Sequence, residues 1–252
     1  MAGIVEDRVR SARVVTTSLV LTAHGSADPR SAANARAVAR QVARLRPDLD
    51  VRVAFCEHNA PGLVEVLNTC PGEAVVTPLL LADAYHARVD IPAQIAECAV
   101  SDRVRQAGVL GEDDRLISVA RQRVMESGVS PLDDTLGVLV VAIGSSNPAA
   151  NSRTADVAPR LAAGTRWAAV TTAFATHPKP SLAESVQRLR DRGARRVVVA
   201  PWFLAPGRIP DRVERFAAEA GVAMAAPLGA HPWVAHTVLD RFDHAAAERV
   251  AA

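Results

Sequence analysis

The chain has 252 residues, a length that fits one large domain or two domains of about 125 residues each. Hydrophobic residues make up 49% and charged residues 22%, a globular composition that excludes disorder, collagen and coiled coils. The net charge of +2 argues against nucleic-acid binding through a basic surface. The cysteines Cys56, Cys70 and Cys98 lack C-x-x-C spacing and are odd in number, so we expect neither a disulfide framework nor a structural zinc site.

The amino-terminal segment and the apolar runs bear on location. Residues 1–13 contain no apolar block, and no later apolar run approaches the length of a membrane-spanning helix. We therefore expect no signal peptide, no membrane partner and a cytoplasmic protein.

Apolar runs alternate with helix-period segments in the first half of the chain. The patterns predict strands at 17–23, 51–56 and 74–80, and helices at 31–46, 61–69 and 92–107. Ser31 is the expected cap of the first helix. Strands that alternate with helices are typical of βαβ units, so the predicted fold class is α/β with a parallel sheet.

The same landmarks recur in the second half. Residues 23–26 (AHGS) align with 142–145 (AIGS), and residues 77–82 (TPLLLA) align with 200–205 (APWFLA). Ile91-Pro92 then aligns with Ile209-Pro210, and Leu110-Gly111 with Leu228-Gly229. We infer two tandem copies, at about 15–127 and 135–252. The predicted domains are 1–130, which carries the candidate functional residues described next, and 131–252.

Imidazoles and a carboxylate follow the predicted strands of the first copy. His24 follows the first strand, Glu57 the second, and His86 lies in the loop after the third. Ligands of open parallel sheets bind beyond the carboxyl ends of the strands, so these side chains are expected at one edge. Imidazole and carboxylate suit binding of a divalent cation and proton uptake near neutral pH.

Structural explanations compete with these assignments. A single histidine in a strand-end loop is more often solvated or hydrogen-bonded in the core, so His24 and His86 are candidates only as a pair. His58 has a counterpart in His177 and is interpreted as structural. Gly25-Ser26 is interpreted as a plain turn in preference to an anion site. Asp90, which precedes Ile91-Pro92, is interpreted as a helix cap in preference to a ligand.

Three motifs in order then carry a family resemblance. The segments 21–30 (LTAHGSADPR), 55–57 (FCE) and 78–92 (PLLLADAYHARVDIP) resemble the sirohydrochlorin chelatase family, whose long members contain two chelatase-like halves. Asp83-Ala84 departs from the small residue and glycine usual in that family. The resemblance implies two chelatase-like domains with a cleft between them for a tetrapyrrole.

The resemblance assigns both catalysis and metal binding to His24, Glu57 and His86. The second copy has Ile143 and Thr176 in place of His24 and Glu57, and its shorter loop, 206–208, has no equivalent of His86. One catalytic half and one degenerate half are therefore expected. Substrate contacts are expected from Ser26 and from Arg30, Arg88 and Arg208, since arginines bind the carboxylates that sirohydrochlorin carries.

The implied activity is insertion of a divalent metal into a sirohydrochlorin-type tetrapyrrole, for sirohaem or cobalamin synthesis. The metal, which is Fe²⁺, Co²⁺ or Ni²⁺, is a substrate, and no tightly bound cofactor is expected. Imidazole and carboxylate accept all three ions, so the sequence does not choose among them. The alternative is a non-catalytic tetrapyrrole or metal carrier of the same fold. A monomer is expected, with a dimer as the alternative.

Overall fold

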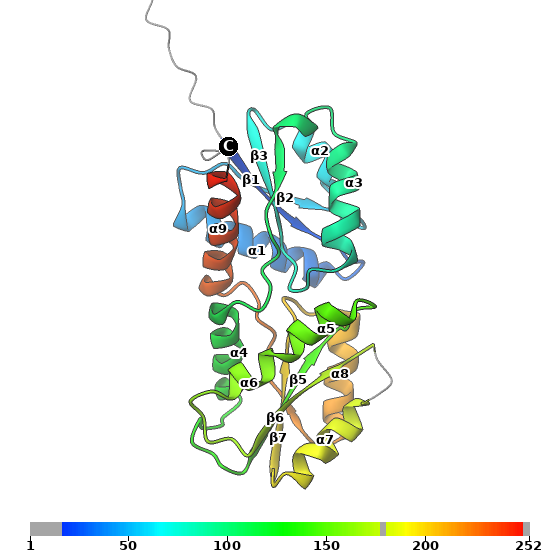
Figure 1. Cartoon of the computed structure of the whole chain (residues 1–252), viewed down its shortest axis with the longest axis vertical. Coiled ribbons are helices and arrows are strands. Elements are labelled where there is room, and N and C mark those ends of the chain that lie inside the picture. Colours follow the sequence, from blue (N-terminus) through cyan, green and yellow to red (C-terminus); the bar gives the residue numbers. More distant parts are fainter. Residues whose placement is uncertain (1–16, 177–179, 249–252) are drawn as a thin grey trace, which may run out of the picture.

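A computed structural model describes residues 17–176 and 180–248, which form two α/β lobes stacked along the long axis of the molecule (Figure 1). One lobe contains a four-stranded sheet in the order β2-β1-β3-β4, and the other a four-stranded sheet in the order β6-β5-β7-β8. All the pairings in both sheets are parallel. The predicted α/β class with two homologous halves is confirmed.

The strands of the first sheet are β1 (Thr17–Ala23), β2 (Val51–Phe55), β3 (Glu73–Pro78) and β4 (Val104–Gln106). Those of the second are β5 (Leu136–Ala142), β6 (Ala169–Phe174), β7 (Arg196–Pro201) and β8 (Ala223–Met224). The central strands β1 and β5 are almost wholly buried, because helices cover both faces of a parallel sheet. Their apolar sequences, SLVLT and LGVLVVA, follow from that burial.

The helices of the first half are α1 (Pro29–Leu45), α2 (Leu63–Asn68), the π-helical turn η1 (His86–Asp90), α3 (Ile91–Ala96), the 3₁₀ turn η2 (Ser101–Arg103) and α4 (Asp114–Glu126). Those of the second half are α5 (Pro148–Ala155), α6 (Val157–Ala162), α7 (Leu182–Asp191), α8 (Arg208–Glu219) and α9 (Pro232–Ala247). Among the described residues, no helix is both long and apolar enough to cross a bilayer.

Two local predictions are wrong. The first helix begins at Pro29, and its cap is Asp28, whose side chain accepts a hydrogen bond from the Arg30 N–H, so Ser31 lies inside the first turn. A proline fits the first helical position because its missing N–H is not needed there. The predicted helix at 92–107 stops at Ala96, and residues 104–106 instead add β4 to the sheet edge.

The two lobes exchange helices. Helix α4, at the end of the first repeat, packs against α6 and β7 of the second lobe. Helix α9, at the end of the second repeat, packs against α1 and β3 of the first lobe, and α4 and α9 also touch (Figure 1). One apolar cluster therefore runs through both lobes and includes Leu19, Val124 and Val238.

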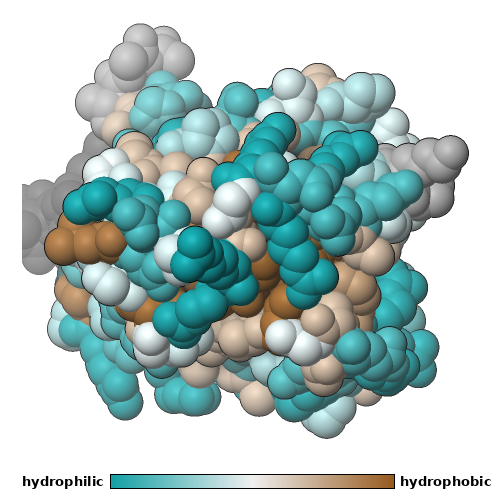
Figure 2. Space-filling model, turned by 90° about the horizontal axis from the view of Figure 1, so that it is seen from below, coloured by the Kyte–Doolittle hydropathy of each residue, from teal (hydrophilic) through white to brown (hydrophobic). Residues whose placement is uncertain are grey.

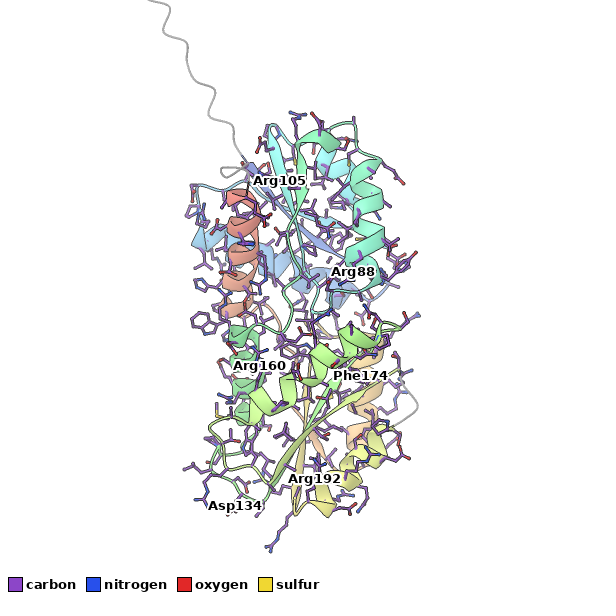
Figure 3. All side chains as sticks on the ribbon, in the orientation of Figure 1. Arg88, Arg105, Asp134, Arg160, Phe174 and Arg192 are labelled. Carbon is purple, nitrogen blue, oxygen red and sulfur yellow. The ribbon has the colours of Figure 1, made fainter. Side chains whose placement is uncertain are left out.

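The carboxyl ends of both sheets point toward the other lobe. Arg88 follows β3, and Phe174 ends β6; Figure 3 shows both where the lobes meet. Asp134 and Arg192 lie at the end of the second lobe that is far from the first lobe. Hydrophilic residues cover most of that far end (Figure 2). The loops that follow the strands of one lobe therefore face those of the other.

Polar contacts join the lobes across this junction. Arg30 at the start of α1 pairs with Asp211 in α8 at 2.5 Å. Asn34 Nδ2 donates a hydrogen bond of 3.0 Å to the carbonyl of Leu204. Arg153 of α5 donates to the carbonyl of Asp83 at 3.4 Å.

Candidate active site

His24 and Glu57 meet at the carboxyl end of the first sheet. The Glu57 N–H donates to the His24 carbonyl at 3.0 Å, which extends the β1–β2 pairing by one step beyond Phe55. His24 Nδ1 lies 3.2 Å from Glu57 Oε1. The Nδ1 atom is buried and makes no hydrogen bond within the described residues.

Gly25 permits this close approach of the two strand ends. Its φ is +98°, a conformation that side chains disfavour. A Cβ atom there would lie 1.8 Å from the Glu57 carbonyl oxygen. The glycine therefore lets the His24 turn close directly over the backbone of Glu57.

His86 enters the site from η1, after the loop that follows β3. Its Nδ1 lies 2.5 Å from Asp90 Oδ2, four residues further along the same turn. Gln106 Nε2 donates to the Ala87 carbonyl at 2.7 Å and ties η1 to the edge strand β4. Tyr85 stands edge-on to the His86 ring at 6.1 Å between centroids and is exposed.

The structure brings the predicted residues together around His24. The His24 and His86 rings lie 3.8 Å apart between centroids, and Glu57 Oε1 lies 3.2 Å from His24 Nδ1. Both imidazoles remain partly open to solvent. As they stand, however, no three His, Cys, Asp or Glu side chains within the described ranges are gathered tightly enough to hold a metal ion, so the three-ligand metal site stays a prediction.

Glu57 also contacts a second histidine, His58, whose Nε2 lies 3.1 Å from the same Oε1 atom. The His58 side chain is about half exposed, with φ at +61°, and does not enter the core. Its predicted counterpart, His177, lies outside the described residues. One carboxylate oxygen therefore sits between two imidazoles.

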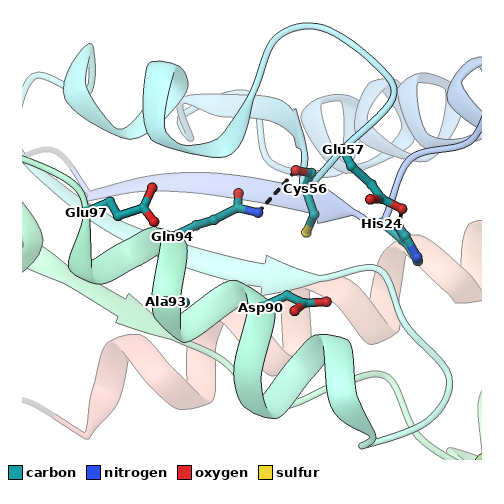
Figure 4. A pocket seen from close by; sticks show the side chains of 7 residues that line it. All are labelled: His24, Cys56, Glu57, Asp90, Ala93, Gln94 and Glu97. Carbon is teal, nitrogen blue, oxygen red and sulfur yellow. Dashed lines mark hydrogen bonds and ion pairs between the residues drawn. The ribbon is translucent and has the colours of Figure 1, made fainter.

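A pocket of about 310 Å³ opens beside these groups (Figure 4). His24, Cys56 and Glu57 lie along one side and the α3 segment along the other. Its lining residues are His24, Cys56, Glu57, Asp90, Ala93, Gln94 and Glu97. Burial, with a smaller effect from the charges of Asp90 and Glu57, raises the pKa of the Cys56 thiol to about 11. Cys56 is thus a neutral thiol at neutral pH and a poor metal ligand in this state.

Two residues of the site were not assigned from the sequence. Asp90 was predicted to cap a helix, but its side chain makes no capping bond and contacts His86. Asn59 Oδ1 accepts a hydrogen bond of 2.8 Å from the Ser26 N–H and so braces the His24 turn. The signal for Asp90 is its four-residue spacing from His86 on a helical turn.

Ser26 has a turn role in both halves. Its Oγ accepts a hydrogen bond from the Asp28 N–H at 3.0 Å, and Ser145 Oγ accepts from the Asn147 N–H at 3.1 Å in the second half. Because the second half retains this arrangement without the histidines, the plain-turn interpretation accounts for the Ser26 hydroxyl. Its contact with substrate stays a prediction.

The three candidate arginines differ in their partners. Arg30 is paired with both Asp28 and Asp211, and its hydrogen bonds hold the pKa of Asp28 at about 2. Arg88 forms two hydrogen bonds with Asp83. Arg208, the exposed first residue of α8, makes no hydrogen bond or ion pair within the part of the chain that the structure describes.

The second lobe keeps the scaffold and lacks these groups. Ile143 occupies the position after β5 and is 47% exposed. The Thr176 N–H donates to the Ile143 carbonyl at 3.0 Å, as Glu57 does to His24. The backbone is thus repeated while the imidazole and the carboxylate are absent from these two positions.

The structure is that of a two-lobed α/β protein whose parallel sheets face each other, with two imidazoles and two carboxylates near the strand ends of the first lobe. The family model described as CbiX matches residues 18–127 and again residues 137–245. The chain belongs to the CbiX family, which confirms the predicted resemblance to sirohydrochlorin chelatases.

Curated relatives agree with that membership, and a solved structure shows the same fold. A sirohydrochlorin cobaltochelatase of Priestia megaterium is 29% identical over 213 residues, which cover 78% of this chain and 67% of the relative. A sirohydrochlorin ferrochelatase of the same species is 29% identical over 212 residues, covering 77% of this chain and 79% of that protein. The structure described as SirB from Bacillus subtilis with Fe³⁺ matches with a TM-score of 0.80 at 22% identity, covering 93% and 97% of the two chains.

Proposed function

We propose that this protein is a sirohydrochlorin chelatase that inserts Fe²⁺ or Co²⁺ into a tetrapyrrole. The observation that carries the proposal is the approach of the His24 and His86 rings, at 3.8 Å, beside the Glu57 carboxylate on a lobe that faces the other. The names of the two Priestia megaterium relatives, one a cobaltochelatase and one a ferrochelatase, support the same substrate class.

The chemistry of insertion requires both ligands and bases. A free-base macrocycle that takes up M²⁺ loses two pyrrole protons, so the site needs ligands that can surrender the ion and groups that accept protons. Neutral imidazole has one nitrogen lone pair for either task, and a carboxylate has two oxygens. We assign these tasks to His24, His86 and Glu57 as a set.

Glu57 contacts the two neighbouring imidazoles through only one of its carboxylate oxygens. Its Oε1 lies between His24 Nδ1 and His58 Nε2, at 3.2 and 3.1 Å. The side chain is about half exposed, so rotation about its χ angles meets little packing. In this proposal, Glu57 accepts a proton or binds the ion through Oε2, or through Oε1 after leaving one of these imidazoles.

The substrate carboxylates have cationic partners nearby. Sirohydrochlorin carries several carboxylates, and a guanidinium group binds a carboxylate through two parallel hydrogen bonds, in a bidentate manner. Arg208 makes no hydrogen bond or ion pair within the described residues, although its charge helps to lower the pKa of Asp28. Arg30 and Arg88 would have to release aspartates. We propose Arg208 as the first contact among the three.

Anaerobic incubation with sirohydrochlorin and Fe²⁺, Co²⁺ or Ni²⁺, followed by absorbance, tests the function. We expect insertion faster than in the protein-free mixture for at least one metal. Binding of the tetrapyrrole or the metal without accelerated insertion would instead identify a carrier. Sedimentation of the same sample tests the proposal that one chain, which contains the whole candidate set, acts as a monomer.

A further inference from the structure

The Asp90 carboxylate contacts the His86 ring and does not cap the helix that follows it. Asp90 precedes the first residue of α3, where an aspartate ordinarily accepts a hydrogen bond from a helix N–H. It makes no such bond. Its Oδ2 atom lies 2.5 Å from His86 Nδ1, and among the described residues His86 is its only hydrogen-bond or ion-pair partner.

The backbone of η1 holds the two side chains on one face. The N–H of Ile91 donates to the His86 carbonyl, five residues back, which closes a π-helical turn. Pro92 has no N–H, so the ordinary α-helical hydrogen bond to the Arg88 carbonyl is not available there. Gln106 holds the turn to β4 through a hydrogen bond to the Ala87 carbonyl. The Arg88–Asp83 pair also holds the turn to the loop that precedes it. The pairing therefore follows from a braced segment of backbone.

A carboxylate at Nδ1 selects one form of a neutral imidazole. The nitrogen beside the carboxylate carries the proton and donates it, so the lone pair is on Nε2. Partners of this kind fix the tautomer and the ring orientation of metal-binding histidines. We propose that Asp90 is a positioning residue that keeps the His86 proton on Nδ1 and presents Nε2 to the divalent metal. The role of the metal rests on the proposed function, whereas the tautomer does not.

A direct role of Asp90 as a metal ligand is the competing explanation. Asp90 lines the same pocket as Glu57, and its charge contributes to the raised pKa of the Cys56 thiol, so the carboxylate faces this space. The two roles predict different behaviour of Asp90→Asn. An amide oxygen still accepts a hydrogen bond from Nδ1–H, but a neutral amide is a much weaker ligand than a carboxylate.

The test compares the full-length wild type with Asp90→Asn, Asp90→Ala and Glu97→Ala. Glu97 is an exposed carboxylate on the rim of the same pocket that makes no hydrogen bond or ion pair within the described ranges, so its removal controls for charge alone. The ¹⁵N–¹H correlations of the histidine rings report the tautomer, and His86→Ala assigns the signal. Titration with Co²⁺ alone reports affinity, and circular dichroism reports folding.

We expect the Nδ1–H tautomer of His86 in the wild type, Asp90→Asn and Glu97→Ala, and its loss in Asp90→Ala. Co²⁺ affinity should fall about 10-fold to 100-fold in Asp90→Ala and less than about tenfold in Asp90→Asn. In insertion assays the KM for metal should rise more than kcat falls. An Nε2–H tautomer in the wild type would overturn the proposal even if Asp90→Ala did not fold. Equal loss of Co²⁺ affinity in Asp90→Asn and Asp90→Ala would identify a ligand instead. A protein that inserts no metal but shows these tautomers would contradict only the proposed function.

Discussion

The imidazole rings of His24 and His86 lie 3.8 Å apart and are tilted by 53°. Each also has its Nδ1 atom next to a carboxylate, Glu57 in one case and Asp90 in the other. His24 directly follows β1, and His86 lies in η1, after the loop that follows the neighbouring strand β3. The pairing therefore depends on the sheet order and not on nearness in the sequence. The proximity of the two rings makes a joint role in metal transfer testable.

Replacement of either histidine by alanine should slow metal insertion at least about tenfold, because a ligand or base is lost from the pair. Steady-state rates with sirohydrochlorin and Co²⁺ measure the effect. His236→Ala, an exposed histidine on α9 whose ring contacts Trp233, is the matched control and should keep the wild-type rate. Wild-type rates in both His24→Ala and His86→Ala would remove the assignment.

Metal binding should be confined to the first lobe. Ile143 offers no lone pair, and the position of Glu57 is taken by Thr176, whose hydroxyl donates to the Ile143 carbonyl. Titration with Co²⁺ alone should give one site per chain, and the double variant His24→Ala/His86→Ala should lose it. Retention of that site in the double variant, with Ile143 and Thr176 intact, would place the ion elsewhere.

Gly25→Ala should destabilise the protein more than Gly128→Ala. Both residues have positive φ, +98° and +81°, which costs an alanine about 1 kcal/mol. A Cβ at Gly128 meets open space, whereas a Cβ at Gly25 overlaps the Glu57 carbonyl and forces the two strand ends apart. Urea unfolding measures the loss of unfolding free energy in each variant. Equal losses would show that the Gly25 turn can relax to accommodate a Cβ.

Asp113 should contribute stability that acid removes. It caps α4 and accepts hydrogen bonds from Arg115 and from Arg241 of α9. Its hydrogen bond with Arg115 is the main cause that lowers its pKa to about 2. The native pKa is therefore below the unfolded value of about 3.9, and the contribution is complete above that value and disappears as pH falls toward 2.

Asp113→Asn keeps a capping side chain but loses the charge, and should cost about 2 kcal/mol at pH 7. The difference in unfolding free energy from wild type should shrink between about pH 4 and pH 2. Asp114→Asn is the control, because Asp114 is 89% exposed in its pair with Arg160 and such pairs contribute about 0–1 kcal/mol. A difference for Asp113→Asn that stays constant with pH would contradict the assignment.

Arg208→Ala should raise the KM for the tetrapyrrole more than Arg88→Ala does. The Arg88 guanidinium is already paired with Asp83, which it would have to leave, while that of Arg208 makes no hydrogen bond or ion pair within the described residues. Initial rates at varied sirohydrochlorin concentration and saturating metal give the KM for the tetrapyrrole in each variant. A larger effect of Arg88→Ala would show that the Asp83 pair opens when substrate binds.

The sequence predicted the neighbourhood of His24, Glu57 and His86 because the position of each after a strand places it at one sheet edge. It did not predict the His86–Asp90 pair, since an aspartate before Ile91-Pro92 carries the signal of a helix cap. Strand β4 was missed because it has three partly exposed residues, too few to show alternation. The apolar stripe of α4 shows that the helix is buried on one side but not which sheet it covers.

The exchange of α4 and α9 affects how the protein is made on the ribosome. Residues near the amino terminus are synthesised first, and an independent domain there could fold before the rest of the chain emerges. Here α1 and β3 gain their covering helix only when α9, at residues 232–247, has been translated. The lobe that carries His24 and His86 therefore completes its core only after α9 has been synthesised, and a nascent chain stalled before α9 would expose that apolar face.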